Sequence, residues 1–98
     1  RSSYELKAYE ILESKFIKNK IKLWQAEFFS IPYLLHGIVH NTIPDIYIEY
    51  KSGKKQIIEV KPFTLLKKNK VKINAMKKYC KKNNIIFSVW TEKELNLI

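Results

Sequence analysis

Two short charged patterns constrain this chain more than any other feature of its sequence. The first is Ile43-Pro44-Asp45-Ile46, and the second, fourteen residues on, is Ile58-Glu59-Val60-Lys61-Pro62. Because residues i and i+2 of a strand point to the same face, Glu59 and Lys61 are expected to project side by side while their apolar neighbours enter the core. Asp45, at the start of the preceding strand, could meet them. Three charged groups that converge on an apolar sheet are costly without a compensating cation or substrate, so this convergence is a hint of function.

The first part of the chain has the spacing of an amphipathic helix. Over residues 3–18, the side chains of Tyr9, Leu12 and Phe16 form an apolar stripe. Glu5 falls on the same stripe, where a carboxylate is costly without a partner, so it is a candidate member of the site. The alternative is a first-turn acid that is favoured by the helix dipole and keeps its carboxylate in water.

The middle of the chain is expected to be extended. Residues 21–29 are rich in aromatic side chains, and Pro32 is expected to end or interrupt that segment. Residues 38–41 can pair locally, and residues 45–50 alternate between apolar and polar positions. Residues 56–60 form a short apolar run stopped by a proline, as expected of a buried central strand.

The last part of the chain predicts a helix followed by a strand. Residues 70–83 return to helical spacing, and residues 85–90 are almost wholly apolar. The helix would be the crossover that joins the Glu59 strand to a parallel partner. Residues 91–94 have capping-box spacing for a short terminal helix. The predicted class is therefore α/β, with a mixed central sheet flanked by helices.

The size and composition of the chain predict one domain. Its 98 residues, 46% of them hydrophobic, suffice for a single modest core, so residues 1–98 are expected to form one domain, which could be a fragment of a longer chain. No apolar run is long enough to cross a bilayer and nothing resembles a signal peptide, so we expect a cytoplasmic protein with no membrane partner. The only cysteine, Cys80, has no second cysteine to pair with and is expected to fill the core.

Positive charge is concentrated in one part of the sequence. The net charge is +10, yet residues 1–50 are balanced, and residues 51–82 carry twelve lysines against the single acid Glu59. One reading is a solvated lysine face, and the other is a phosphate-binding surface that steers a polyanion toward the candidate site. His40 could touch phosphate or orient a water, or could be a hydrogen-bonded structural group. The candidate nucleic-acid-binding residues are Lys51, Lys54, Lys55, Lys67, Lys68, Lys70 and His40.

The acids and the lysine suit hydrolysis of a phosphodiester with a divalent cation. Mg²⁺ prefers hard oxygen ligands and keeps several waters, so Asp45, Glu59 and the backbone carbonyl of Val60 are a plausible partial shell for Mg²⁺ or Mn²⁺. The Lys61 ammonium, next to that shell, could stabilise the transition state or orient the attacking water. Glu5 could hold a second ion or a metal-bound water.

This arrangement resembles the PD-(D/E)xK nuclease superfamily, whose core runs α-β-β-β-α-β. The superfamily motif corresponds here to Pro44-Asp45 and Glu59-Val60-Lys61. Further segments resemble two branches, the TnsA-type transposon-end endonucleases and the head-completion nucleases of tailed phages, and the resemblance covers nearly the whole chain. Those segments are Arg1–Leu6, Trp24–Glu27, Ile31–Tyr33 and His40–Asp45.

The resemblance implies a restriction-endonuclease-like fold and a set of site residues. It implies that Glu5, Asp45 and Glu59 are metal-binding catalytic acids and that Lys61 is the catalytic lysine. A DNA endonuclease in a bacterial or phage-infected cell is then the expected activity, with a junction-resolving nuclease as a variant. Besides DNA, a second copy of the chain or a partner protein is an expected partner.

Two functions of other classes stay open. The first is a non-catalytic nucleic-acid-binding or phage or transposon assembly protein on the same fold. Its signature would be loss of an active-site acid or the lysine, and Glu5, Asp45, Glu59 and Lys61 are all present. The second is a basic RNA-binding module of the translation machinery, which would account for the lysines and aromatic residues but leaves the acid cluster unexplained.

Overall fold

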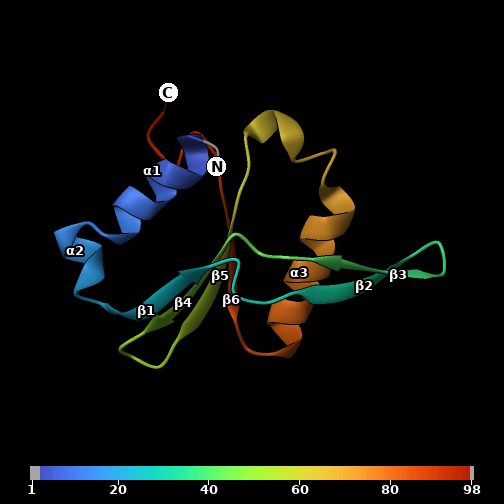
Figure 1. Cartoon of the computed structure of the whole chain (residues 1–98), viewed down its shortest axis with the longest axis horizontal. Helices are drawn as coiled ribbons and strands as arrows, with labels where there is room; N and C mark the ends of the chain where they lie inside the picture. Colours follow the sequence, from blue (N-terminus) through green and yellow to red (C-terminus); the bar gives the residue numbers. More distant parts are fainter. Residues whose placement is uncertain (1–2, 98) are drawn as a thin grey trace.

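A four-stranded mixed sheet forms the centre of the molecule (Figure 1). The computed structural model describes residues 3–97, apart from the side chains of Lys15 and Phe16. In order across the sheet the strands are β1 (Ile21–Ala26), β4 (Ile46–Tyr50), β5 (Lys55–Val60) and β6 (Ile86–Trp90), and helix α3 spans Lys70–Lys82. Strand β4 is antiparallel to β1 and β5, and β6 is parallel to β5 through the crossover helix α3.

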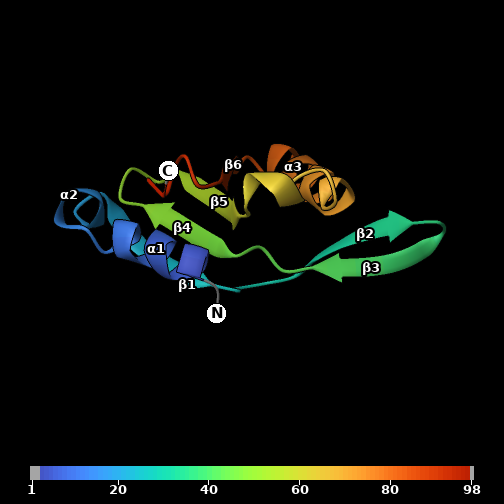
Figure 2. The same ribbon diagram turned by 90° about the horizontal axis from the view of Figure 1, so that it is seen from above.

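The two faces of the sheet are covered by different helices (Figure 2). Helix α1 (Ser3–Leu12) packs on one face and α3 on the other. The alternation of β4 and β5 decides which side chains meet which helix, since Ile48 and Ile58 pack with α1 whereas Tyr47 and Ile57 pack with α3. The predicted α-β-β-β-α-β order and mixed sheet are therefore confirmed.

A β-hairpin between β1 and β4 extends beyond the body of the molecule (Figures 1 and 2). It consists of β2 (Ile31–Leu35) and β3 (Ile38–Thr42), which pair only with each other within residues 3–97. The prediction that Pro32 ends the preceding strand was wrong: β1 ends at Ala26, and Pro32 lies inside β2. A proline is tolerated there because a two-stranded ribbon leaves one edge of each strand without a partner.

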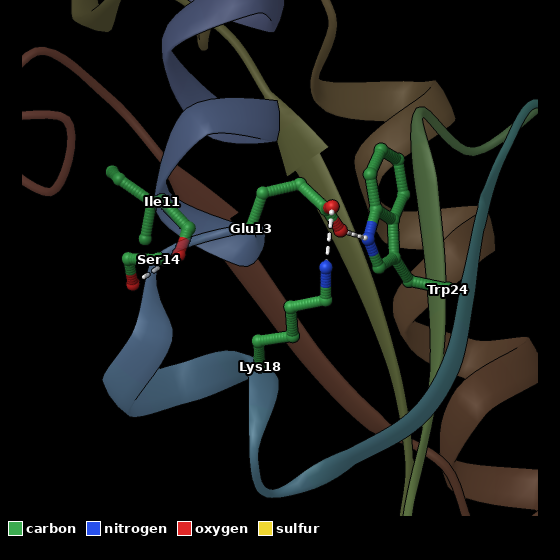
Figure 3. A network of polar contacts seen from close by, with 5 residues as sticks. All are labelled: Ile11, Glu13, Ser14, Lys18 and Trp24. Atoms are coloured by element: carbon green, nitrogen blue, oxygen red, sulfur yellow. Dashed lines mark hydrogen bonds and ion pairs between the residues drawn. The ribbon is translucent and has the colours of Figure 1, made fainter.

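The first helix is shorter than its spacing predicted. Helix α1 ends at Leu12, and a second short helix, α2 (Lys15–Lys18), follows a break at Ser14, whose backbone is extended at φ −65° and ψ 141°. The Ser14 hydroxyl donates a 2.7 Å hydrogen bond to the Ile11 carbonyl, a local bond that competes with the helix (Figure 3). The predicted Phe16 part of the apolar stripe lies outside the described side chains.

Glu13, next to the helix break at Ser14, connects this part of the chain to strand β1 of the sheet (Figure 3). Its carboxylate accepts a 2.7 Å hydrogen bond from the Trp24 indole and forms a 3.3 Å ion pair with Lys18. The hydrogen bond from Trp24 and then that from Lys18 hold the pKa of Glu13 below its ordinary value. The Trp24 ring also stacks on Tyr9 of α1, with ring centroids 5.2 Å apart, so one tryptophan positions both helices against β1.

The predicted terminal helix is only a turn. The Thr91 backbone N–H donates to Glu94 Oε1 at 2.7 Å, and the Lys93 N–H donates to Thr91 Oγ1 at 3.3 Å, so bonds of the capping-box kind do form. The helix does not continue because Asn96 takes the left-handed φ of 59°. Among residues 3–97, no helix has the length and apolar character required to span a bilayer.

Candidate active site

Asp45 and Glu59 are held together by two reciprocal hydrogen bonds. The Val60 backbone N–H donates to Asp45 Oδ2 at 2.7 Å, and the Asp45 backbone N–H donates to Glu59 Oε1 at 3.1 Å. The antiparallel ladder brings these segments together, because Ile46 pairs with Ile58 next to the two acids. Each carboxylate is thus oriented by the backbone of the other acid's segment. The sequence-based expectation that Asp45 meets the second motif is confirmed.

Burial and proximity raise the pKa of Glu59. Its side chain lies in an interior strand and the residue is only 4% exposed, whereas Asp45 is half-buried. Burial, followed by the charge of Asp45, raises the pKa of Glu59 to about 8, and the Lys61 ammonium opposes this increase. Burial and the neighbouring Asp45 side chain therefore disfavour a negative charge on Glu59.

Lys61 lies beside Glu59, as the i and i+2 spacing predicted. Its backbone N–H donates to the Trp90 carbonyl at 3.0 Å, which continues the β5–β6 ladder by one residue. The ammonium Nζ lies 3.7 Å from Glu59 Oε2, and 28% of the side chain is exposed. The centre thus contains two acids and one cationic donor that solvent can reach.

Glu92 is a residue that the sequence reasoning did not identify as part of this region. Its Oε1 accepts hydrogen bonds from the Phe63 backbone N–H at 2.8 Å and from the Tyr4 hydroxyl at 3.0 Å. Phe63 begins the short 3₁₀ helix η1 (Phe63–Leu65), which follows β5. Glu92 therefore ties the first turn of α1 to the chain just beyond Lys61. No local pattern could reveal this contact, because its partners lie 29 and 88 residues away.

Glu5 lies in the first turn of α1 and is half-buried. Helix α1 covers the face opposite to Glu59, because Ile58 and Val60 on either side of Glu59 pack with α1. Glu5 could approach the two acids only around the carboxyl end of β5, near which the Tyr4–Glu92 contact holds the start of α1 (Figure 1). Its role in the site stays a prediction.

The predicted DNA-binding lysines divide into two groups at opposite ends of the sheet. Lys51, Lys54 and Lys55 lie at the β4–β5 turn, and Lys55 is four residues, or about 13 Å, from Glu59 along β5. The expected phosphate-binding surface next to the candidate site therefore does not include this group, because an antiparallel hairpin places its turn at the far end of the sheet. The second group, Lys67, Lys68 and Lys70, follows η1 at the Glu59 end (Figure 1).

Further lysines follow the second group along helix α3, and no acidic residue of the helix neutralises them. In the part of the chain that the structure describes, none of the lysines from Lys67 to Lys82 has a carboxylate within ion-pair distance. No acidic residue occurs between Glu59 and Glu92, so this segment has no carboxylate of its own to neutralise its lysines. The outer side of α3 is therefore a strip of exposed positive charge.

His40 lies on the projecting hairpin rather than beside the carboxylates in the sheet. Its exposed ring stacks on Tyr33 of β2, with ring centroids 5.6 Å apart. The Tyr33–His40 pair is a cross-strand contact of β2 and β3. The structure thus gives His40 a packing contact, and its predicted contact with phosphate stays a prediction.

The pair of acids offers a partial set of metal ligands. Within residues 3–97, no three histidine, cysteine, aspartate or glutamate side chains are grouped closely enough to hold a metal ion. Asp45 and Glu59 alone provide hard carboxylate oxygens, the donors that Mg²⁺ and Mn²⁺ prefer, and Mg²⁺ commonly uses one or two carboxylates with waters and substrate phosphate. The Asp45–Glu59 pair therefore fits a divalent cation, whose positive charge would favour the ionised form of Glu59.

The fold and this centre define a class: a mixed α/β domain with a restriction-endonuclease-like core. The sequence profile of the family described as TnsA-like endonuclease N terminal matches residues 18–92. The chain belongs to this family, which supports a nuclease-related function and confirms the TnsA-type branch of the resemblance. No curated protein matches the chain at a significant level.

Proposed function

We propose that this chain is a divalent-metal-dependent DNA endonuclease that hydrolyses phosphodiester bonds at Asp45, Glu59 and Lys61. One observation carries the proposal: reciprocal backbone hydrogen bonds of 2.7 and 3.1 Å fix two carboxylates together, with an ammonium 3.7 Å from one of them. Membership of an endonuclease family supports the same activity.

Each residue has a role that its position supports. Asp45 and Glu59, with the Val60 carbonyl, would hold a Mg²⁺ or Mn²⁺ ion, which when bound supplies neutralisation of the scissile phosphate and a more acidic water. Glu59 would give up its proton to become a ligand. Lys61 would place its ammonium against the developing charge of the phosphoryl oxygens or orient the attacking water. Glu5 would assist from α1.

The lysine strip supplies affinity for the substrate in this proposal. Lys67, Lys68 and Lys70 lie at the same end of the sheet as the acids, so a phosphate backbone bound there would pass near Glu59. Contacts of this kind are independent of base sequence and weaken steeply with salt. A general DNA substrate, with little sequence readout by this domain, is therefore the substrate we propose.

Cleavage with matched variants tests the proposal. The purified chain is incubated with supercoiled plasmid, branched DNA and single-stranded DNA, in Mg²⁺, Mn²⁺ or chelator. The Lys61→Ala variant is compared with Lys22→Ala, which removes the same charge from an exposed position on β1. DNA binding is measured separately in chelator, so that loss of affinity is distinguished from loss of chemistry.

The expected result is metal-dependent nicking by the wild type and Lys22→Ala, with a loss of at least about 100-fold in Lys61→Ala at similar DNA affinity. A preference for branched DNA would identify the junction-resolving variant of the activity. DNA binding without cleavage on any substrate would contradict the proposal and favour a non-catalytic binding or assembly protein on the same fold.

A further inference from the structure

The projecting hairpin is an uncharged arm on a strongly basic chain. We define the arm as residues 31–42, which comprise β2, β3 and the turn between them. No Asp, Glu, Lys or Arg occurs from Phe28 to Pro44, although the chain as a whole carries a net charge of +10. The arm therefore adds no lysine or arginine to the phosphate-binding surface.

The arm is anchored at its base and exposed at its tip. At the base, Ile31 is 1% exposed and packs with Met76 of α3, and its register partner Thr42 is 7% exposed. Toward the tip, Leu34 and Val39 are paired with each other, and they are 71% and 64% exposed. Contiguous exposed apolar side chains of this kind mark an interaction surface.

The arm is built to keep its shape without a partner. All five residues of β2 are paired in register with the five of β3, from Ile31–Thr42 to Leu35–Ile38. The two-residue turn, His36 and Gly37, has φ of 52° and 76°, the double left-handed conformation of tight hairpins that match strand twist. A preformed strand ribbon needs little ordering when another strand pairs with it.

Only one edge of the arm is open for further pairing. Strand β2 contacts α3 and contains Pro32, which lacks an N–H donor. Strand β3 has no proline, lysine or bulge among its residues Ile38–Thr42. By contrast, β1, an edge of the main sheet, carries Lys22 and a register shift, which are devices that discourage pairing with another chain.

We propose that the arm is a self-association surface, in which β3 pairs antiparallel with β3 of a second copy of this chain. The result is a four-stranded ribbon around a two-fold axis near His40, the middle residue of β3. A second copy fits because the two uncharged edges are identical and complementary, whereas the rest of each chain, with its excess of lysines, repels its copy. The inference does not depend on the proposed nuclease activity.

Sedimentation equilibrium tests this pairing. The wild type is measured from roughly 1 µM to roughly 1 mM, the range in which weak specific association is detected. The variant Ile38→Lys introduces a charge at the open edge, and in a two-fold assembly it does so twice. Its matched control is Ile86→Lys, which makes the same substitution at an exposed isoleucine outside the arm. Ile86 lies on β6, an edge strand of the main sheet.

The expected mass of the wild type at high concentration is twice the 11.7 kDa of one chain. Ile38→Lys should raise the dissociation constant at least about tenfold, and Ile86→Lys should leave it unchanged. A double variant, Ile38→Lys with Val39→Lys, should be monomeric, and its thermal unfolding should match the wild type since both positions are exposed.

Several results would overturn the inference. A wild type that stays monomeric throughout the range would show that the arm does not pair with a second copy. Association that survives in the double variant, or that is lost in Ile86→Lys, would place the contact elsewhere. Open-ended polymers would contradict a closed two-fold pairing.

Discussion

Replacement of Glu59 by glutamine removes the charge competition at the centre while keeping the shape of the side chain. A glutamine Oε1 can still accept the 3.1 Å hydrogen bond from the Asp45 backbone N–H. It cannot ionise. In metal-free buffer, the change in stability caused by Glu59→Gln therefore reports the free energy of ionising a buried carboxyl group beside Asp45.

The size and sign of the effect follow from the pKa of Glu59. Its ordinary value is 4.5, and burial and Asp45 raise it to about 8 in the folded protein. Between these values the folded state holds a proton that the unfolded state has lost, so the contribution of Glu59 to stability is greatest below pH 4.5 and falls as the pH increases toward 8. At about 1.4 kcal/mol for each pH unit, the loss amounts to at most about 5 kcal/mol.

The assay is urea unfolding in chelator at a series of pH values from 5 to 8.5. We expect the wild type to lose stability across this range, and Glu59→Gln to lose much less and to exceed the wild type at pH 8 by up to about 5 kcal/mol. Glu10→Gln is the matched control, because Glu10 is 71% exposed on α1 and should leave the slope unchanged. Identical slopes for the wild type and Glu59→Gln would refute the reasoning.

Three further predictions concern the core, the thiol and the lysines. Met76→Ala should lower the free energy of unfolding by about 2 to 5 kcal/mol, whereas Val71→Ala, exposed on the same helix, should change it by less than about 0.5 kcal/mol in urea unfolding. Burial raises the pKa of the Cys80 thiol to about 11, so a thiol reagent at pH 8 should label it only after unfolding, and rapid labelling of the native protein would contradict its buried place. Replacing Lys67 and Lys68 by alanine should weaken DNA binding and reduce its logarithmic salt slope by about 2, measured by fluorescence anisotropy, more than the same change at two lysines of the β4–β5 turn.

The sequence predicted the sheet and the meeting of the acids because both depend on local patterns of apolar residues. The alternation of residues 45–50 and the apolar run of residues 56–60 indicated two neighbouring strands, and the short loop between these strands predicted an antiparallel pairing. Helical spacing after a buried strand similarly predicted the crossover α3 and the parallel strand β6. These inferences needed no information about distant contacts.

The features that the sequence did not predict depend on contacts between residues far apart in the chain. The helix break at Ser14 accompanies a hydrogen bond between Glu13 and Trp24, eleven residues apart, and spacing alone could not show it. Lys51 and Lys54 lie at the end of the sheet opposite to Glu59, because the turn of the β4–β5 hairpin is there. Net charge along the sequence does not contain this information. The contact of Glu92 with the first turn of α1 links the two ends of the chain.

The most direct test of the central claim, that Asp45 and Glu59 form one cation site, is calorimetric titration with Mn²⁺ at pH 7 in buffers of different ionisation enthalpy. Because the raised pKa of about 8 keeps Glu59 protonated at this pH, binding should release about one proton for each ion bound. Asp45→Asn should abolish binding, and Lys61→Ala should retain it. Binding without proton release, or equal binding by the wild type and Asp45→Asn, would contradict the account.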